Sequence, residues 1–329
     1  MEARPLRIGI LGAATIAPMA LVRPSRAVPE TEVVAVAARD PLRAARFAKR
    51  HGIAKVHASY DALLSDPVID AVYNPLPNGL HCVWTLRALA AGKHVLCEKP
   101  IASNADQAQQ MAEAALKSER VLLEAFHWRH HPLAARMREI LRAGELGEIR
   151  HVEASTCIPM LSPRNIRFRY DLAGGALMDI GSYAVNMVRW LAEAEPEVAS
   201  AQAKLLSPDV DRWLRAELRF ADGRTGRVTC SLLSATLLRL QIRVEGSRGS
   251  MRVFNPLAPH FYHRLRVDAA DGRRSERVPG EATYTHQLRH FVARVRGAAP
   301  GPTEASDAVA NMRAIDAIYR AAGLRRRGD

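Results

Sequence analysis

Lysine, cysteine and long apolar runs are all scarce in this chain of 329 residues. The four cysteines, at positions 82, 97, 157 and 230, lie far apart and form no C-x-x-C pair. This spacing disfavours a disulfide framework or a zinc knuckle and predicts a reducing, cytoplasmic location. No run of about 18 apolar residues occurs, so the sequence predicts no membrane-spanning helix.

The positive charge is unevenly divided between lysine and arginine. Lys and Arg together number 47 against 34 Asp and Glu, a formal net charge of +13. Only six of the 47 are lysines; the 41 arginines are spread over the whole length, with Arg325-Arg326-Arg327 as the one basic block. A nucleic-acid-binding protein usually concentrates its charge in a stripe or a tail. The scatter therefore disfavours nucleic acid as a partner.

Short apolar runs alternate with amphipathic segments in the first part of the chain. The sequence predicts strands at residues 6–11, 32–38, 71–74, 93–97 and 121–124, with helices between them. Such alternation is typical of βαβ units and a parallel sheet. It predicts an α/β Rossmann domain, a doubly wound parallel sheet, over residues 1–125, with ligands at the carboxyl ends of the strands.

The pattern changes after Pro132. A helix is predicted at 133–143, strands at 149–156, 216–220, 226–232, 240–245 and 250–254, and helices at 176–191, 285–296 and 305–322. Turn residues at Asp222-Gly223 and at 247–249 separate consecutive strands. Residues 126–329 are thus predicted to form an α+β domain with a large, mostly antiparallel sheet.

A turn of small residues follows the first predicted strand. Gly12 takes the first glycine position of the dinucleotide fingerprint G-x-G-x-x-G, and Ala14 and Ala17 take the other two. Small residues there let the backbone approach a pyrophosphate at a helix N-terminus, so Gly12, Ala14, Thr15 and Ile16 are candidate cofactor contacts. A plain strand-to-helix turn, which needs small residues only for packing, is the alternative.

The end of the second predicted strand bears on the choice between NAD and NADP. NAD-binding sites usually place an acid there for the ribose 2′-OH, whereas this strand ends Ala37-Ala38-Arg39-Asp40. A guanidinium suits a 2′-phosphate, which it binds bidentately. Arg39 therefore favours NADP over NAD; the alternative is that it is one surface arginine among many.

Three further motifs occur in order: residues 74–81 (NPLPNGLH), 91–100 (AGKHVLCEKP) and 174–183 (GGALMDIGSY). With the opening turn they resemble the Gfo/Idh/MocA family, two-domain NAD(P)-dependent oxidoreductases that act mostly on sugars and polyols. Within the family the chain is most similar to the branch of dihydrodiol dehydrogenase and NADP-dependent xylose dehydrogenase. The sugar-nucleotide 3-ketoreductases are similar too.

The resemblance assigns roles to individual residues. Lys99 matches the family's essential lysine, near the nicotinamide and the substrate hydroxyl. Asp179 and Tyr183 stand where many members have an Asp and a His, and Tyr183 matches the acid/base tyrosine of the dihydrodiol branch. The resemblance also implies a homodimer formed by the sheet of the second, substrate-binding domain. The implied cofactor contacts are Gly12, Ala14, Thr15, Ile16, Arg39, Pro75, Leu76, Asn78, His81, Glu98 and Lys99.

The residue types suit this chemistry independently of the family. Hydride transfer from an alcohol requires that the hydroxyl proton leave in the same event. A tyrosine, with an ordinary pKa of about 10, is a poor base at neutral pH unless a cation lies beside it, and Lys99 is the expected cation. Asp179 and Tyr183 are four residues apart and share a face of the predicted helix. The structural alternatives are a loop lysine, an orienting aspartate and a core tyrosine.

Arginine and histidine side chains supply the remaining candidates. Arg129 and His131, at the domain crossover, are expected to contact the substrate with Arg167, Asp179 and Tyr183. The histidines beside Arg129 lack a nearby carboxylate or cysteine partner, so no metal is predicted. Arg164 and Arg169 flank Arg167, and surface solvation is the competing interpretation for at least two of these three arginines. For His81 a structural role weighs equally with a cofactor contact.

The sequence therefore predicts a cytoplasmic NADP-dependent dehydrogenase or reductase that acts on a secondary hydroxyl or ketone of a sugar, polyol or cyclic diol. The expected partner is this small molecule, with neither nucleic acid nor membrane. A non-catalytic NADP-binding sensor or scaffold on the same fold is one alternative, which the presence of both Lys99 and Tyr183 disfavours. A basic nucleic-acid-binding protein is the other.

Overall fold

The computed structural model describes residues 4–162, 164–298 and 304–329. Within it the chain forms two compact units. The first unit comprises Met1–His127 and Tyr284–Val309, and the second comprises Trp128–Thr283 and Ala310–Asp329. The sequence predicts a single domain boundary, after residue 125. The structure differs, because the later segment Tyr284–Val309 also belongs to the first unit.

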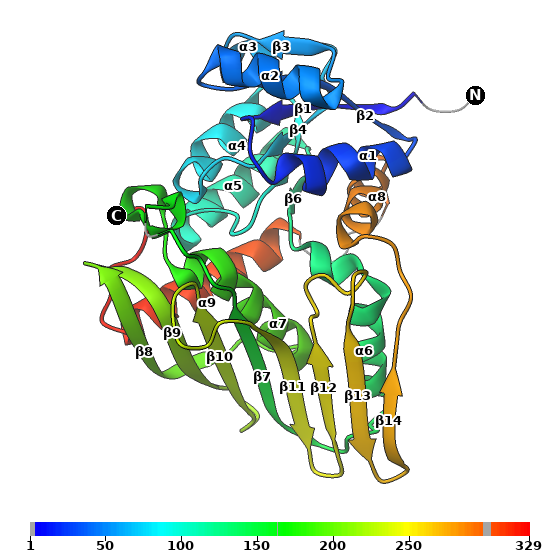
Figure 1. Ribbon diagram of the computed structural model, residues 1–329, viewed down its shortest axis with the longest axis vertical. Coiled ribbons are helices and arrows are strands. Elements are labelled where there is room, and N and C mark those ends of the chain that lie inside the picture. Colours follow the sequence, from blue (N-terminus) through cyan, green and yellow to red (C-terminus); the bar gives the residue numbers. More distant parts are fainter. Residues whose placement is uncertain (1–3, 163, 299–303) are drawn as a thin grey trace. The chain divides into compact units, whose positions relative to one another are not determined.

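The first unit contains a six-stranded parallel sheet of order β3-β2-β1-β4-β5-β6 (Figure 1). This is the strand order of a Rossmann fold, so the predicted doubly wound parallel sheet is confirmed. Its central strands are buried, as helices on both faces require, with Ile10, Val72 and Val95 each at 0% exposure. The strands are β1 (Leu6–Leu11), β2 (Thr31–Ala37), β3 (Lys55–His57), β4 (Ala71–Asn74), β5 (His94–Cys97) and β6 (Leu122–Glu124).

Local sequence signals set where the helices of the first unit begin. The side chain of Asp40 accepts hydrogen bonds from two N–H groups in the first turn of α2, and Ser59 and Asn104 cap α3 and α5 in the same way. The α-helices are α1 (Arg23–Ala27), α2 (Pro41–His51), α3 (Tyr60–Leu64), α4 (His81–Ala90) and α5 (Ala105–Ser118). A π-helical turn, η1 (Pro18–Val22), precedes α1, and a 3-10 turn, η2 (Asn78–Leu80), precedes α4.

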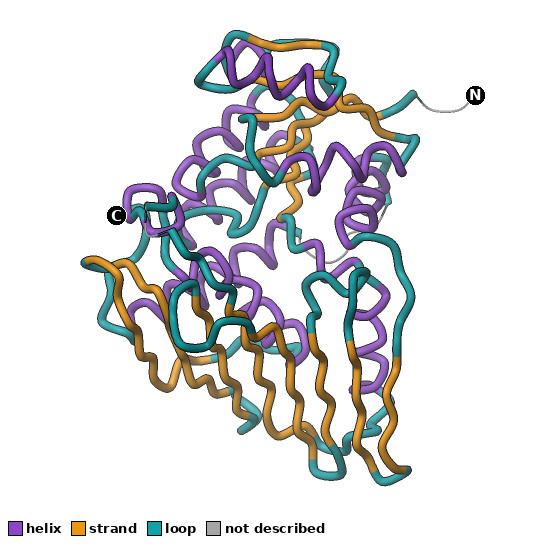
Figure 2. The backbone as a smooth tube through the Cα atoms, in the orientation of Figure 1, coloured by secondary structure: helices purple, strands orange, loops and turns teal. Residues whose placement is uncertain are grey.

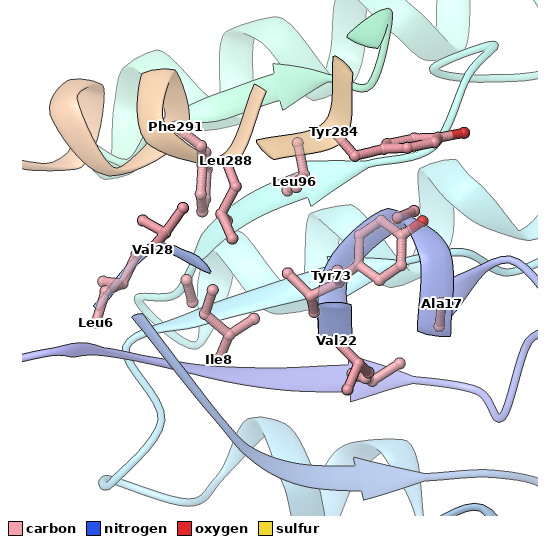
Figure 3. Packing of buried hydrophobic residues seen from close by; sticks show 14 of the residues in the cluster. Leu6, Ile8, Ala17, Val22, Val28, Tyr73, Leu96, Tyr284, Leu288 and Phe291 are labelled. Carbon is pink, nitrogen blue, oxygen red and sulfur yellow. The ribbon is translucent and has the colours of Figure 1, made fainter. Parts of the chain in front are cut away.

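Helix α8 (Thr283–Val295) explains why the first unit gains a late segment. Its apolar residues Tyr284, Leu288 and Phe291 recur at helical spacing, and each is at most 7% exposed. Figure 3 shows these side chains facing Ile8, Tyr73 and Leu96 of the parallel sheet, with which they share one core. Helix α8 therefore belongs to the first unit, because its apolar side chains are buried in that unit's core.

The second unit contains an eight-stranded sheet of order β14-β13-β12-β11-β7-β10-β9-β8. Six of its seven pairings are antiparallel and β7–β10 is parallel, so the predicted large, mostly antiparallel sheet is confirmed. The strands are β7 (Ile149–Cys157), β8 (Glu197–Ser207), β9 (Val210–Arg219), β10 (Thr225–Ser231), β11 (Arg239–Gly246), β12 (Ser250–Phe254), β13 (Arg264–Ala269) and β14 (Gly272–Glu276).

Three of these strands, β8, β13 and β14, are absent from the sequence prediction. In β13 the buried Leu265 and Val267 alternate with exposed residues, two of them arginines, which weaken the apolar signal of a short strand. Strand β8 lies at the edge of the sheet and has no fully buried residue. A prediction based on apolar runs thus misses edge strands and arginine-rich strands.

Helices lie against one face of the eight-stranded sheet (Figure 2). Helix α7 (Ser182–Ala192) packs on β7 and β10, and ten of its eleven residues are buried. The other helices are α6 (Pro132–Arg142) and α9 (Ala305–Ala321), and the short turns are η3 (His127–His130), η4 (Ile166–Phe168), η5 (Tyr170–Leu172) and η6 (Leu177–Gly181). None of the helices in the described part of the chain combines the length and apolar character that a membrane crossing requires.

Candidate functional site

The turn after β1 is shaped by Gly12. Its φ of +98° is a conformation that other residues rarely adopt, and a Cβ there would lie 3.0 Å from Cδ2 of Leu76. The Gly12 N–H donates to the carbonyl of Ala37 at 2.7 Å, which fastens the turn to the end of β2. The predicted helix through residue 27 begins later than expected, with the π-helical turn η1 before α1. Residues 14–16 thus form an irregular, partly exposed stretch.

Two arginines follow β2. Arg39 is exposed beside the Tyr60 side chain, which receives a backbone hydrogen bond from Arg39. Arg43, in the first turn of α2, donates from Nη2 to the carbonyl of Ala13 at 2.9 Å. Burial raises the pKa of Tyr60, and the charges of Arg39 and Arg43 oppose that shift. The carboxyl end of β2 thus carries two guanidinium groups close to the Gly12 turn, chemistry that suits a phosphate.

His81 joins two loops at the carboxyl ends of β4 and β5. Its ring is 0% exposed; Nε2 lies 2.7 Å from the Leu76 carbonyl and Nδ1 lies 2.8 Å from the Pro100 carbonyl. Burial lowers the pKa of His81 to about 4, although both carbonyl contacts favour the protonated ring. The side chain therefore has a structural function, and a cofactor contact by His81 stays a prediction.

Asn74 organises the start of the same loop. It is 0% exposed, and its side-chain amide donates to the His81 carbonyl at 3.2 Å and to Oγ1 of Thr85 at 3.1 Å. Its Oδ1 accepts from the N–H of Leu76 at 3.4 Å. Because Asn74 fixes both ends of residues 76–81, the backbone near Pro75, Leu76 and Asn78 is held in one position.

The loop after β5 carries Glu98 and Lys99. Oε1 of Glu98 accepts a hydrogen bond from the Tyr73 hydroxyl at 2.6 Å, and Oε2 accepts from the Lys99 N–H at 3.3 Å. The Lys99-Pro100 peptide is cis, and the Lys99 side chain is partly exposed while Glu98 is buried. Burial raises the pKa of Tyr284, and the Glu98 carboxylate adds to the rise. The Glu98 carboxylate is thus fixed by the Tyr73 hydroxyl and accepts a hydrogen bond from the Lys99 backbone N–H.

These loops fit a dinucleotide. Gly12 follows β1, Arg39 follows β2, Pro75 follows β4 and Lys99 follows β5, so all four lie at the carboxyl edge of one parallel sheet. That edge is where open α/β sheets bind ligands, and the Gly12 turn has the close backbone approach that a pyrophosphate needs. Gly12, Arg39 and Arg43 have the chemistry that suits phosphates, and contact of Asn78 and Lys99 with the nicotinamide stays a prediction.

In the second unit, the turn Gly174-Gly175 leads into the segment with Asp179 and Tyr183. A Cβ on Gly174 would lie 2.6 Å from the Arg167 carbonyl, and Gly175 has a φ of +130°. The predicted regular helix here begins instead as the π-helical turn η6, and α7 follows from Ser182. Inserted π turns are frequent at functional sites. Asp179 lies inside η6, and Tyr183, at 5% exposure, lies in the first turn of α7.

The arginines before this turn differ in their partners. Nε of Arg167 donates to Oδ2 of Asp179 at 2.9 Å, so the structure brings these two predicted substrate residues together. Arg169 forms an exposed ion pair with Asp171, and Arg164 is exposed. All three arginines are exposed, and Arg167 is the one paired with the Asp179 carboxylate.

Arg129 and His131 are both buried in the second unit. The Arg129 guanidinium lies 4.1 Å from the ring centroid of Trp190, a cation–π geometry. His131 is 1% exposed; its Nδ1 accepts the Leu133 N–H at 3.1 Å and so caps α6. These contacts give both residues packing functions, and their contact with a substrate stays a prediction. Among the described residues, no cluster of His, Cys, Asp and Glu could hold a metal ion.

Known families match both halves of the chain. Residues 6–126 match the oxidoreductase family with an NAD-binding Rossmann fold, and residues 134–252 match the GFO/IDH/MocA C-terminal domain. The chain belongs to the Gfo/Idh/MocA oxidoreductase family. The resemblance inferred from the motifs is thereby confirmed, and with it the expectation of an enzyme of the dehydrogenase or reductase class.

Several relatives within Gfo/Idh/MocA match over nearly the full length of both chains. The dTDP-3,4-didehydro-2,6-dideoxy-alpha-D-glucose 3-reductase of Streptomyces violaceoruber is 36% identical, and the match covers 98% of this chain and 96% of the relative. The D-xylose 1-dehydrogenase (NADP(+)) 2 of Haloferax volcanii is 33% identical, with 96% and 97% covered. The structure of KijD10, a 3-ketoreductase from Actinomadura kijaniata in complex with NADP and TDP-benzene, is similar with a TM-score of 0.90 at 31% identity, covering 97% of this chain and 98% of that one.

Two residues beside the expected Gfo/Idh/MocA cofactor site are missing from the sequence prediction. Arg43 lies in the first turn of the helix that follows β2, and this position just after the strand is a signal that could have found it. Tyr284 packs against His127, with ring centroids 4.1 Å apart, and the charge of Glu98 acts on it. Tyr284 is 186 positions from Glu98, so no local pattern in the sequence connects them.

Proposed function

We propose that this chain is an NADP-dependent oxidoreductase that interconverts a secondary hydroxyl and a ketone on a sugar, a polyol or a cyclic diol. The observation that carries the proposal is the common position of Gly12, Arg39, Pro75 and Lys99 at the carboxyl edge of the first unit's sheet. A dinucleotide bound along this edge would extend from the phosphate-binding guanidinium groups to the lysine loop. The net reaction moves a hydride and a proton together, so a proton-transfer group is required beside the cofactor.

The relatives support both the cofactor and the substrate class. The Haloferax enzyme is named as an NADP(+) dehydrogenase of xylose, and KijD10 is described in complex with NADP. The Streptomyces relative is named as a 3-reductase of a keto sugar nucleotide. In this chain, Arg39 and Arg43 supply charge for a 2′-phosphate, and no acid takes the place of Ala38 at the end of β2. We therefore favour NADP and a sugar-type carbonyl.

Lys99 and Tyr183 are proposed to carry proton transfer, with Asp179 in support. When bound, the nicotinamide supplies or accepts the hydride at the substrate carbon. The Lys99 ammonium donates to the substrate oxygen and stabilises the negative charge that develops there. The Tyr183 hydroxyl gives a proton to that oxygen in reduction and takes it in oxidation. Asp179, held by Arg167 at 2.9 Å, keeps a fixed carboxylate one helical turn from Tyr183.

A homodimer in the cytoplasm is the proposed state of the enzyme. The eight-stranded sheet exposes apolar side chains such as Phe254, at 45%. An exposed apolar sheet face is a common site of association between copies. Size-exclusion chromatography with light scattering should give twice the mass of 36.2 kDa, and a monomer at micromolar concentration would contradict the dimer.

The test of function follows NADPH absorbance with a panel of keto sugars, and NADP reduction with sugars, polyols and cyclic diols. Turnover is expected with at least one compound and should be faster with NADPH than with NADH. Lys99→Ala and Tyr183→Phe should each lower kcat by about 10²- to 10⁴-fold, the usual contribution of a general acid or base. Neither should change the Kd of NADPH, measured by fluorescence, more than a few-fold.

Matched variants control for nonspecific damage. Lys117→Ala removes a lysine from α5, and Tyr262→Phe removes a hydroxyl from a residue that is 46% exposed. Both should keep wild-type turnover. Tight NADPH binding without turnover on the whole panel would overturn the enzyme assignment and favour a cofactor-binding sensor. Normal turnover in Lys99→Ala would refute the assigned function of that residue.

A further inference from the structure

The basic block Arg325-Arg326-Arg327 is divided by the fold. Arg325 and Arg326 form ion pairs at the surface, with Asp209 and Asp329. Arg327 is instead 0% exposed and ranks among the largest fully buried side chains of the chain. Burying a guanidinium is costly unless its charge and its donors are matched. The partners of Arg327 therefore show what this charge is used for.

Arg327 binds the turn that precedes Asp179 and Tyr183. Its Nε donates to the carbonyl of Gly174 at 2.7 Å, and Nη2 donates to Oδ1 of Asp211 at 3.0 Å. The guanidinium also lies 4.1 Å from the ring centroid of Tyr319. The planar group thus reaches a turn carbonyl and a carboxylate at once, which requires the fork of an arginine.

Asp211 holds the other side of the same turn. It lies in β9, is 0% exposed, and its Oδ2 accepts the Leu177 N–H at 2.7 Å. Its Oδ1 also accepts the Tyr319 hydroxyl at 2.9 Å. Leu177 is the first residue of η6, so Asp211 caps this π-helical turn from a distant strand. Burial raises the pKa of the Asp211 carboxyl, and the charge of Arg327 and the Leu177 N–H oppose the rise.

Arg327 and Asp211 therefore hold the backbone on both sides of Gly175. Arg327 fixes the carbonyl before it and Asp211 fixes the N–H two residues after it. A Cβ on Gly175 would lie 2.1 Å from Oδ1 of Asp211, so the turn packs directly on the ion pair. The Gly175 carbonyl in turn accepts the Asp179 N–H at 3.0 Å. A shift of this turn would move Asp179 and the start of α7 with it.

We propose that Arg327 and Asp211 are positioning residues. Their hydrogen bonds to Gly174 and Leu177, which we call the latch, hold the Gly174-Gly175 turn in place and so set the placement of Asp179 and Tyr183. The effect on catalysis rests on the proposed function of those two residues. The effect on the turn does not, because it follows from the hydrogen bonds of Gly174 and Leu177. The latch is confined to the second unit, so its loss leaves the residues proposed to bind the cofactor in place.

Arg327→Met and Arg327→Lys test the latch, with Arg325→Met as the matched control from the surface ion pair. Hydrogen exchange measured by mass spectrometry should accelerate at least 10-fold in the peptide over residues 174–183 of Arg327→Met. The β7 peptide over residues 149–157 should keep its wild-type rate. With a substrate that supports turnover, kcat should fall at least 10-fold while the Kd of NADPH stays within twofold. Arg325→Met should match the wild type in both measurements.

The lysine variant separates positioning from general stability. Arg327→Lys keeps the charge beside Asp211 but loses the fork, so its urea midpoint should recover toward that of the wild type while kcat stays low. Wild-type kcat and exchange in folded Arg327→Met would overturn the latch. Faster exchange at 174–183 with unchanged kcat would keep the latch on the turn but refute its link to catalysis. If the wild type itself shows no turnover, the proposed function fails and the exchange data alone decide the latch.

Discussion

Two turns that carry candidate site residues are held by buried polar side chains of opposite character. In the first unit a single His81 ring, with its pKa lowered to about 4, contacts the carbonyls of Leu76 and Pro100, which lie five and 19 residues away. In the second unit the ion pair of Asp211 and Arg327 holds the Gly174 turn, and Arg327 is 153 residues from Gly174. One anchor is local and neutral at neutral pH; the other is remote and charged.

The difference predicts different costs of disruption. Removing one member of a buried ion pair leaves a charge without a partner in a low-dielectric interior. A neutral ring donates one N–H, so its removal leaves one carbonyl without a donor, which is a smaller penalty. The second unit should therefore be more sensitive to a single polar substitution than the first, and its sensitivity should concentrate at the pair.

The largest effect is expected from Asp211→Asn. This change keeps the side-chain shape but leaves Arg327 buried without a countercharge, which should lower the free energy of unfolding by about 3–5 kcal/mol. Asp209→Asn is the control, because Asp209 pairs with Arg325, whose side chain is 66% exposed, and it should cost less than about 1 kcal/mol. Urea unfolding followed by circular dichroism measures both. Similar costs for the two variants would contradict the special position of the buried pair.

The second prediction concerns acid and the first unit. In the unfolded chain a histidine takes up a proton near pH 6.5, whereas buried His81 resists protonation down to about pH 4. The unfolded state therefore binds more protons in that window, so the stability is fully present above about pH 6.5 and is lost as the pH falls toward 4. The difference of about 2.5 pKa units corresponds to about 3 kcal/mol.

His81→Gln should flatten this pH dependence of the urea midpoint. Part of the slope should remain, because burial also lowers the pKa of His94 to about 4. His151→Gln, at a partly exposed position on β7, should keep the slope of the wild type. An unchanged slope in His81→Gln would show that the ring does not hold the loops as a neutral group.

The same contrast explains what the sequence could predict. The parallel strands of the first unit and the loops proposed to bind the cofactor depend on short motifs, in which Gly12, Asn74 and Lys99 each stand next to or within the strand that positions them. The predicted elements around them match the structure within a few residues. The exception is the start of the first helix, where a π-helical turn replaces a regular one.

The anchors of the second unit could not be predicted in this way. Asp211, Tyr319 and Arg327 lie on three separate segments, and only the folded sheet and helices bring them to Gly175. Arg327 is hidden among 41 arginines, so its residue type carries no signal. The π turn at Asp179 also leaves no signal in the sequence, because the four-residue spacing between Asp179 and Tyr183 fits a regular α-helix as well. Long-range polar contacts are thus the part of this site that can be recognised only in the folded structure.

A third prediction asks whether cofactor choice belongs to the first unit alone. Arg39→Ala should weaken NADPH binding about 10- to 100-fold, since a hydrogen bond to a charged group contributes about 1.5–3 kcal/mol. NADH lacks the 2′-phosphate, so its Kd should change less than threefold. Arg46→Ala, an exposed arginine on α2, is the control. Equal loss of both cofactors in Arg39→Ala would refute the 2′-phosphate contact.

The smallest effect should come from Asp40→Ala at the start of α2. Asp40 caps its own helix, accepting from Leu42 N at 2.9 Å and Arg43 N at 3.2 Å, whereas Asp211 caps η6 from another strand. Because Asp40 is exposed, water replaces the lost acceptor, and the cost should be about 1 kcal/mol in urea unfolding. Fraying of this turn should also weaken NADPH binding slightly, since Arg43 holds the Ala13 carbonyl. If Asp40→Ala cost as much as Asp211→Asn, burial and charge would not be what distinguishes the two anchors.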